Sequence, residues 1–163
     1  MTNYLSTNAA FALKVKDLHD LLATQIGDAM DQSGMIIPSK TSAIVELLFE
    51  NDSLSKADIS KELSFSHQLC TQRLAWLEKH QMVSVKEDPN DRRRQIIQLT
   101  EAGKFEARKL RAFLPRLQQA YESLFSELGL NLDDVLQRAS FALEQDSLVA
   151  RISRNSQHKV SAE

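Results

Sequence analysis

The chain has 163 residues, about the length of one domain, and 42% of its residues are apolar and 26% charged. These values suit a single globular domain that buries its own core, and only four glycines and three prolines leave little chain for loops, so we expect a mainly helical fold. The formal net charge of −2 argues against indiscriminate coating of nucleic acid. The chain lacks the pattern of a secretion signal and any window near the roughly 20 apolar residues of a membrane span, so we expect a cytoplasmic protein with no membrane partner.

Apolar residues at steps of three and four predict a long first helix of about 20 residues or more. The stripe consists of Phe11, Val15, Leu18, Leu22, Ile26 and Ala29. Gly34 and Pro38 end this helix, and the apolar residues between Ser39 and Glu50 predict a second, more deeply buried one.

Two short helical patterns separated by a tight turn come next. Ser55 and Asp58 have the spacing of a capping box and predict a helix that runs to about Leu63. Ser66 is a good N-cap for a second helix that reaches His80. A short helix, a tight turn and a second helix form the helix-turn-helix arrangement.

Alternation of apolar and polar residues over Val83–Glu87 and Gln95–Leu99 predicts the two strands of a β-hairpin. The turn begins with the sequence DPND, which places the consecutive arginines Arg92, Arg93 and Arg94 at the tip. A basic hairpin directly after a helix-turn-helix is the layout of a winged helix. Residues 66–94 hold six basic and four acidic residues, whereas residues 120–146 hold one basic and six acidic, so the middle of the chain suits an anionic partner.

The C-terminal third predicts two more helices and a tail. Thr100 caps a long helix in which Pro115 should cause a kink or a split, and Asn131 starts a last helix. Residues 152–163 are polar and are expected to form a disordered tail.

The second helix of the helix-turn-helix sorts into two faces when each residue rotates by about 100°. Cys70, Leu74 and Leu77 share the apolar face. The polar face consists of His67, Gln68, Thr71, Gln72 and Ala75. Glutamine can bond bidentately to adenine, and Thr and His can bond base edges or phosphate. In isolation such a face would only be solvated, but the adjoining basic hairpin favours DNA contact.

Two further groups of charged residues have alternative interpretations. The arginines of the tip could merely keep a loop soluble, but a hairpin beside a groove-bound helix can place arginine in the minor groove. Asp91 would then orient one arginine through a charged hydrogen bond. Arg73 rotates toward the apolar face and either extends its stem to the surface or pairs with Asp58 or Glu62.

The stretch from Leu54 to Lys104, above all its segments DPNDRR and LTEAG, closely resembles the winged-helix core of MarR-type transcriptional regulators. The resemblance implies a core at about 39–104 and a homodimer whose interlocking helices lie at about 7–33 and 105–146. It also implies DNA contacts by the second helix and the wing. These contacts would come from Ser66, His67, Gln68, Thr71 and Gln72, with Asp91 and Arg93 as the wing pair and Arg92 or Arg94 as neighbours. Gln81 departs from the family pattern, in which glycine usually follows the helix.

By this resemblance the chain is expected to be a sequence-specific DNA-binding regulator, a homodimeric repressor that a small aromatic or phenolic effector releases from a near-palindromic operator. Phe11, Phe49, Tyr121 and Phe125 could line an effector pocket, although aromatic residues at helical spacing are usually core.

Two rival interpretations stay open, and a third, an enzyme, is not expected. A winged helix can bind proteins instead of DNA, because a fold does not settle function. Cys70, the single cysteine, could be a redox switch, although its place on the apolar face favours a core residue. We find no catalytic motif and no histidine pair at ligand spacing, so we expect no enzyme, metal or cofactor.

Overall fold

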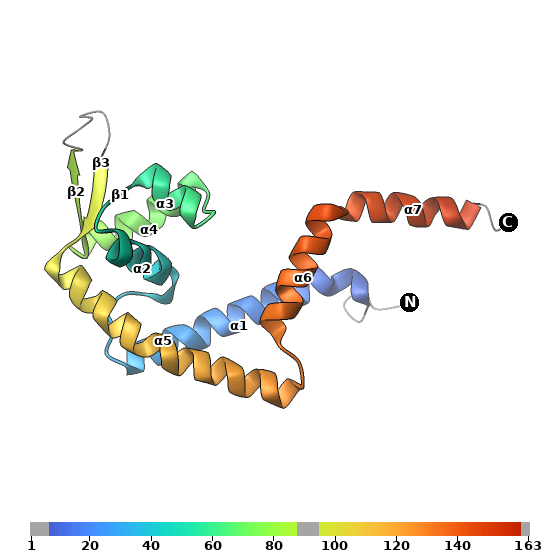
Figure 1. Cartoon of the computed structure of the whole chain (residues 1–163), viewed down its shortest axis with the longest axis horizontal. Helices are drawn as coiled ribbons and strands as arrows, with labels where there is room; N and C mark the ends of the chain where they lie inside the picture. Colours follow the sequence, from blue (N-terminus) through green and yellow to red (C-terminus); the bar gives the residue numbers. More distant parts are fainter. Residues whose placement is uncertain (1–6, 88–94, 161–163) are drawn as a thin grey trace. The chain divides into compact units, whose positions relative to one another are not determined.

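The computed structural model describes residues 7–87 and 95–160, and the chain divides into two compact units (Figure 1). Unit 1 comprises Met1–Pro115 and unit 2 comprises Arg116–Glu163. The boundary falls inside a single helix, which continues through Pro115. Pro115 therefore does not split the helix.

Unit 1 holds the helices expected from the apolar spacing, with bounds close to those predicted, together with two short 3-10 helices that were not predicted. They are η2 (Asn8–Ala10), α1 (Phe11–Gln32), η3 (Ser39–Thr41), α2 (Ser42–Asn51), α3 (Lys56–Glu62), α4 (His67–Lys79) and the first part of α5 (Glu101–Leu128). The segment predicted as one helix from Ser39 begins with the 3-10 turn η3 before α2 starts. The capping box is confirmed, because the Ser55 side chain accepts from the Asp58 backbone and the Asp58 side chain accepts from the Ser55 backbone.

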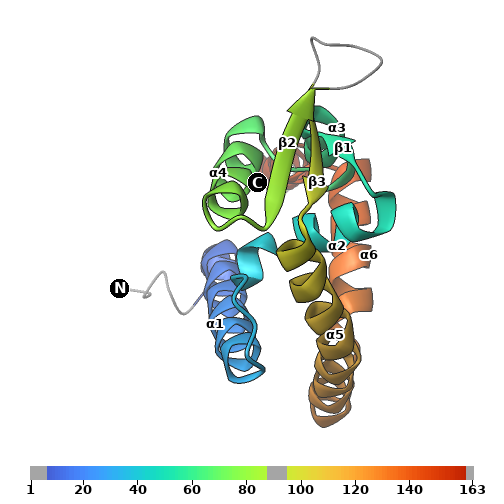
Figure 2. The same ribbon diagram turned by 90° about the vertical axis from the view of Figure 1, so that its left-hand side faces the viewer.

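A small antiparallel sheet completes unit 1 and contains the predicted hairpin (Figure 2). Its strands are β1 (Leu54–Ser55), β2 (Val83–Glu87) and β3 (Gln95–Leu99), in the order β1-β3-β2. In the hairpin Val83 faces Leu99 and Glu87 faces Gln95. Strand β1 was not predicted, since two residues are too few to show alternation and their partners in β3 are distant in the sequence, with Leu54 pairing with Ile97 and Ser55 with Ile96.

The core of unit 1 lies where α2, α3, α4 and the sheet meet. Side chains that are less than 2% exposed there include Ile37, Ile44, Val45, Leu48, Ile59, Cys70 and Leu77. Full burial of one such aliphatic side chain contributes roughly 1.5–3 kcal/mol, so this cluster stabilises the helix-turn-helix and the hairpin together.

Three helices of unit 1 end in the same way, with a residue in the left-handed conformation at Gly34, Ser64 and Gln81. After α4, the Gln81 N–H donates to the Glu78 carbonyl at 2.9 Å and the Met82 N–H donates to the Leu77 carbonyl at 2.8 Å, which is a Schellman ending. Gln81 thus adopts the conformation that glycine usually supplies, with φ of 58°. The helix-ending geometry is kept despite the departure, at a backbone cost of roughly 1–2 kcal/mol.

The segment LTEAG joins the hairpin to α5 through two contacts. The Thr100 hydroxyl accepts from the Gly103 N–H at 3.1 Å and donates to the Gln81 carbonyl at 2.6 Å, so one side chain caps α5 and holds the end of α4. A Cβ at position 103 would lie 2.0 Å from the Met82 carbonyl oxygen. Only glycine allows α5 to approach the backbone of residue 82 so closely.

A buried carboxylate joins α5 to the connection between α1 and η3. Glu106 is 1% exposed and accepts from the backbone N–H of Ile36 at 2.7 Å and of Ile37 at 3.4 Å. Its other oxygen pairs with Lys109 at 2.7 Å, and Lys109 also donates to the Gly34 carbonyl at 2.6 Å. Burial raises the pKa of Glu106, but these hydrogen bonds outweigh it and hold the pKa below its usual value.

Unit 2 comprises the end of α5, then α6 (Leu132–Gln145) and α7 (Leu148–Val160). The Asn131 side chain caps α6 by accepting from the backbone N–H groups of Asp133 and Asp134, at 2.9 and 3.2 Å. No residue of α6 is buried.

The prediction of a disordered tail from residue 152 is wrong, because α7 continues to Val160. Ser147 starts this helix by accepting from the Ala150 N–H, and Asp146 forms ion pairs with Arg151 and Arg154 on its first turns. These local contacts, rather than a buried apolar face, favour a helix in a segment that is polar in sequence. Residues 161–163 lie outside the described part.

Gly103→Ala is expected to lower the free energy of unfolding by about 2 kcal/mol or more, because the added methyl group meets backbone that cannot move independently. An alanine inside a helix normally stabilises it by about 0.5–1 kcal/mol relative to glycine, so a loss is diagnostic of the close approach. Gly27→Ala in α1 is the matched control, since its Cβ would lie 3.9 Å from the nearest neighbour, the Ser39 hydroxyl. Urea denaturation measures both, and equal gains would contradict the packing described.

Glu106→Ala is expected to lower the free energy of unfolding at pH 7 by about 2–4 kcal/mol, because two backbone N–H groups and Lys109 lose their acceptor. The lowered pKa of Glu106 means that its ionised form stabilises the fold above the ordinary pKa of about 4.3, and that this contribution is lost as the pH falls through the lower folded value. The stability gap between wild type and Glu106→Gln should therefore shrink in acid. Glu127→Gln, at an exposed glutamate of the same helix, is the control, and a pH-independent gap for Glu106→Gln would reject the assignment.

Candidate nucleic-acid interface

Helix α4 is set in place at its start and along one face. The Ser66 side chain accepts from the Leu69 N–H at 3.2 Å, which confirms the predicted N-cap. Cys70, Leu74 and Leu77 are buried, as predicted, and α4 packs against α3, β2 and η3. Because these three side chains fix the rotation of the helix, its opposite face is turned to solvent.

The solvent face of α4 is the predicted one. Its exposed residues are His67, Gln68, Thr71, Gln72 and Ala75. The first four of these line one shallow hollow on the surface. Within residues 7–87 and 95–160, the side chains of Gln68 and Gln72 form no hydrogen bond, so both amides are free to pair with a ligand. A primary amide offers a donor and an acceptor side by side, which matches the edge of adenine in the major groove.

The Thr71 side chain differs from the glutamines because it already has partners. Its hydroxyl donates to the His67 carbonyl at 2.7 Å and lies 3.2 Å from the donating Nζ of Lys56. Lys56 is exposed and begins α3, so the first helix of the pair contributes a cation to the edge of this face. Lys56 was not among the predicted contact residues, although its position just after the capping residue Ser55 could have indicated it.

Arg73 lies at the edge of the apolar face and is half-buried. Its guanidinium carbon lies 4.2 Å from the ring centre of Phe65, the residue in the turn between α3 and α4. Neither Asp58 nor Glu62 is its partner, and within the described part of the chain its buried Nε has no hydrogen bond. Of the two alternatives for Arg73, the ion pair is therefore wrong, and the guanidinium makes a cation-π contact with the turn instead.

The hairpin lies beside α4 within unit 1 (Figure 2), and β2 packs directly against that helix. Lys86 on β2 donates to the Gln98 side chain on β3 at 3.2 Å. The predicted wing residues Asp91, Arg92, Arg93 and Arg94 lie in residues 88–94, outside the described part. Their DNA contacts stay a prediction.

Cys70 is fully buried, and its thiol lies 3.8 Å from the Lys56 carbonyl. An oxidant could reach this sulfur only if α3 and α4 separated. The burial supports a small core residue and gives no support to a redox switch.

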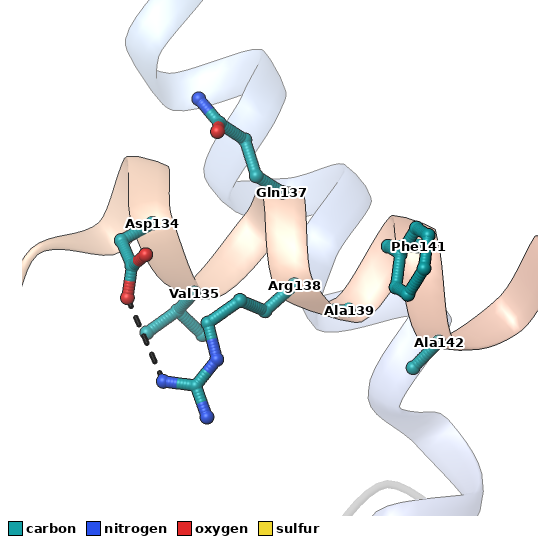
Figure 3. A pocket seen from close by; sticks show the side chains of 7 residues that line it. All are labelled: Asp134, Val135, Gln137, Arg138, Ala139, Phe141 and Ala142. Carbon is teal, nitrogen blue, oxygen red and sulfur yellow. Dashed lines mark ion pairs between the residues drawn. The ribbon is translucent and has the colours of Figure 1, made fainter.

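The four aromatic residues considered for an effector pocket are divided between the units. Exposed Phe11 and half-buried Phe49 belong to unit 1, where Phe49 lies under the Arg111 guanidinium at 4.8 Å. Tyr121 and Phe125 stack in unit 2 with ring centres 6.2 Å apart. A separate open hollow lies on α6, where all seven lining residues come from that one helix and Arg138 pairs with Asp134 at 3.6 Å (Figure 3).

Two classes of feature are absent from the described part of the chain. No helix within residues 7–87 and 95–160 has the length and apolar character needed to cross a bilayer. Within the same ranges, His, Cys, Asp and Glu side chains do not gather in groups of three or more that could hold a metal ion.

Comparison by sequence gives no match to a protein-family model or to a curated protein. Comparison by structure does give matches. The PcaV transcriptional regulator from Streptomyces coelicolor is 18% identical with a TM-score of 0.67, and the match covers 86% of this chain and 99% of that one. The heme sensor protein PefR from Streptococcus agalactiae, solved with heme, is 15% identical with a TM-score of 0.60, covering 85% and 95%.

The adhesin competence repressor AdcR from Streptococcus pyogenes is 23% identical with a TM-score of 0.55, covering 80% of this chain and 95% of that one. At these identities the likeness concerns the fold. The chain has a winged helix-turn-helix core flanked by N- and C-terminal helices, the fold that its resemblance to MarR-type regulators implied.

Proposed function

We propose that the chain is a sequence-specific, double-stranded-DNA-binding transcriptional regulator. The observation that carries the proposal is the exposed polar face of α4, where Gln68 and Gln72 present unpaired amides while Cys70 and Leu77 anchor the opposite face. A helix that enters the major groove needs such a face. The short helix α3 and the turn before α4 complete the helix-turn-helix that positions such a helix on DNA.

The proposed binding mode assigns separate tasks to separate elements. Base edges are read by Gln68, Gln72 and His67. Ser66, which precedes α4, contacts the sugar-phosphate backbone of the DNA. Arg92, Arg93 and Arg94 on the wing enter the neighbouring minor groove, with Asp91 orienting one of them. The fold of the transcriptional regulators to which the chain is similar supports this division.

We also propose that the protein acts as a homodimer. Large apolar side chains of α6 are exposed in the single chain, with Phe141 at 63% and Leu136 at 53%. Along α1, Phe11 at 64% and Leu21 at 54% are similarly uncovered. Apolar surface of this extent is unusual on a monomer and supports a second copy as the partner. A two-fold dimer would bind a near-palindrome with half-sites about 10–10.5 base pairs apart.

Release from DNA by a small aromatic or phenolic effector is the regulatory part of the proposal, with repression as its default outcome. One similar structure is of a heme sensor solved with heme, and another is of a repressor. In this chain the half-buried stacked pair of Tyr121 and Phe125 could accept a flat ring.

The affinity for duplex DNA is expected to fall steeply with salt, by orders of magnitude between about 50 and 200 mM, because phosphate contacts release counterions. A mobility-shift titration with sites selected from random duplexes measures this, and footprinting should show two half-sites one helical turn apart. A protein-binding adaptor is the rival function. Absence of duplex binding at low salt would favour the adaptor and overturn the proposal.

Gln68→Ala is expected to change base preference more than general affinity, because a bidentate amide contributes about 1–3 kcal/mol of discrimination at one base pair. Selection from random duplexes with wild type and variant compares their preferred sites. Gln118→Ala is the control, since Gln118 is an exposed glutamine of α5 and lies outside the helix-turn-helix segment of the sequence. Equal losses on selected and random DNA would remove Gln68 from the base-reading set.

A further inference from the structure

The hydroxyl of Thr71 is already committed within the protein. A hydroxyl has one hydrogen to donate and two lone pairs to accept with. The hydrogen is donated to the His67 carbonyl at 2.7 Å, and one lone pair accepts from Lys56 Nζ at 3.2 Å. No hydrogen is left to donate to the acceptor groups that guanine, adenine or thymine present in the major groove.

The other branch of the Thr71 side chain has no such commitment. Thr71 is exposed and lines the same hollow as Gln68 and Gln72, and its methyl group is the part without a polar partner. A methyl group on this face can pack against the C5-methyl group of thymine, the one apolar feature in the major groove. The hydroxyl can still accept a hydrogen bond, but the only polar group that thymine presents in the major groove is itself an acceptor, so toward thymine the methyl group is the part of Thr71 that can make contact.

Lys56 supplies the charge that Thr71 lacks. Its ammonium group lies at the edge of the α4 face and is held there only by a neutral hydroxyl within the described part of the chain. An ionised phosphate oxygen is a stronger acceptor than a hydroxyl, because a charge-assisted hydrogen bond is roughly twice as strong as a neutral one. When a duplex lies against α4, we expect Lys56 to donate its hydrogen bond to the DNA phosphate beside α3 instead of to the Thr71 hydroxyl.

We propose that position 71 reads thymine through its methyl group and that Lys56 moves from the Thr71 hydroxyl to a backbone phosphate on binding. The inference rests on the proposed DNA-binding function and deepens it by assigning a base contact and a phosphate contact. Lys56 belongs to α3 and lies 15 residues before Thr71 in the sequence, so only the fold brings the two together.

Two substitutions at position 71 separate the methyl group from the hydroxyl. Thr71→Val keeps a branched methyl group and removes the hydroxyl, whereas Thr71→Ser keeps the hydroxyl and removes the methyl group. Valine and serine differ little from threonine in helix propensity, and thermal unfolding checks that both variants fold. The DNA probe is the duplex selected by the wild type, with each thymine replaced in turn by deoxyuridine, which lacks only the C5-methyl group.

Wild type and Thr71→Val are both expected to lose about fourfold in affinity at one thymine of each half-site when its methyl group is removed, the effect of one buried methyl group. Thr71→Ser should show no such loss at that position. If Thr71→Val becomes insensitive to deoxyuridine while Thr71→Ser stays sensitive, the hydroxyl carries the contact and the inference is overturned. Insensitivity of the wild type at every thymine would also overturn it.

Lys56→Gln tests the phosphate contact independently. The variant is expected to bind selected and random duplexes more weakly by similar factors and to reduce the slope of log affinity against log salt by about one. Lys61→Gln is the matched control, since Lys61 is an exposed lysine of the same helix at the opposite end from Lys56. A wild-type slope in Lys56→Gln would reject the lysine contact. Failure of the wild type to bind any duplex at low salt would instead overturn the proposed function, which distinguishes the two failures.

Discussion

The rotation of α4 about its own axis is the constraint on which the proposed interface depends. Burial of Cys70, Leu74 and Leu77 on one side fixes the rotation of α4, and this rotation turns the polar side toward solvent. A change of one residue in phase would turn Glu78 or Arg73 toward the core, and burying a charged side chain without a partner is costly. The core of unit 1 thus determines what the surface presents.

Contacts at the base of the hairpin hold the end of α4 against the hairpin and α5. Thr100 bonds the carbonyl that follows α4, Gly103 lets α5 approach Met82, and Glu106 joins the same helix to Ile36. The segment LTEAG therefore connects α4, the hairpin and α5 through direct contacts. Unit 2 contrasts with this closed arrangement, because α6 buries none of its own residues and needs a further surface.

Much of the fold could be predicted because its signals are local. The capping pairs at Ser55 and Ser66, the apolar spacing of α1 and α4 and the alternation in β2 and β3 each lie within a few neighbouring residues. The two errors had different causes. Strand β1 depends on a distant partner, and α7 on short-range ion pairs to Asp146 that the polar composition of the tail concealed.

The sequence by itself determined the helix-turn-helix, the hairpin and the two faces of α4, because helical and strand periodicity are written in consecutive residues. Only the tertiary structure decided the partners of individual side chains. It placed Arg73 over Phe65, buried Glu106 beneath Ile36, and joined Lys56 to the hydroxyl of Thr71. Each of these contacts joins different segments of the chain, and such proximity is set by packing, which periodicity along the chain does not record.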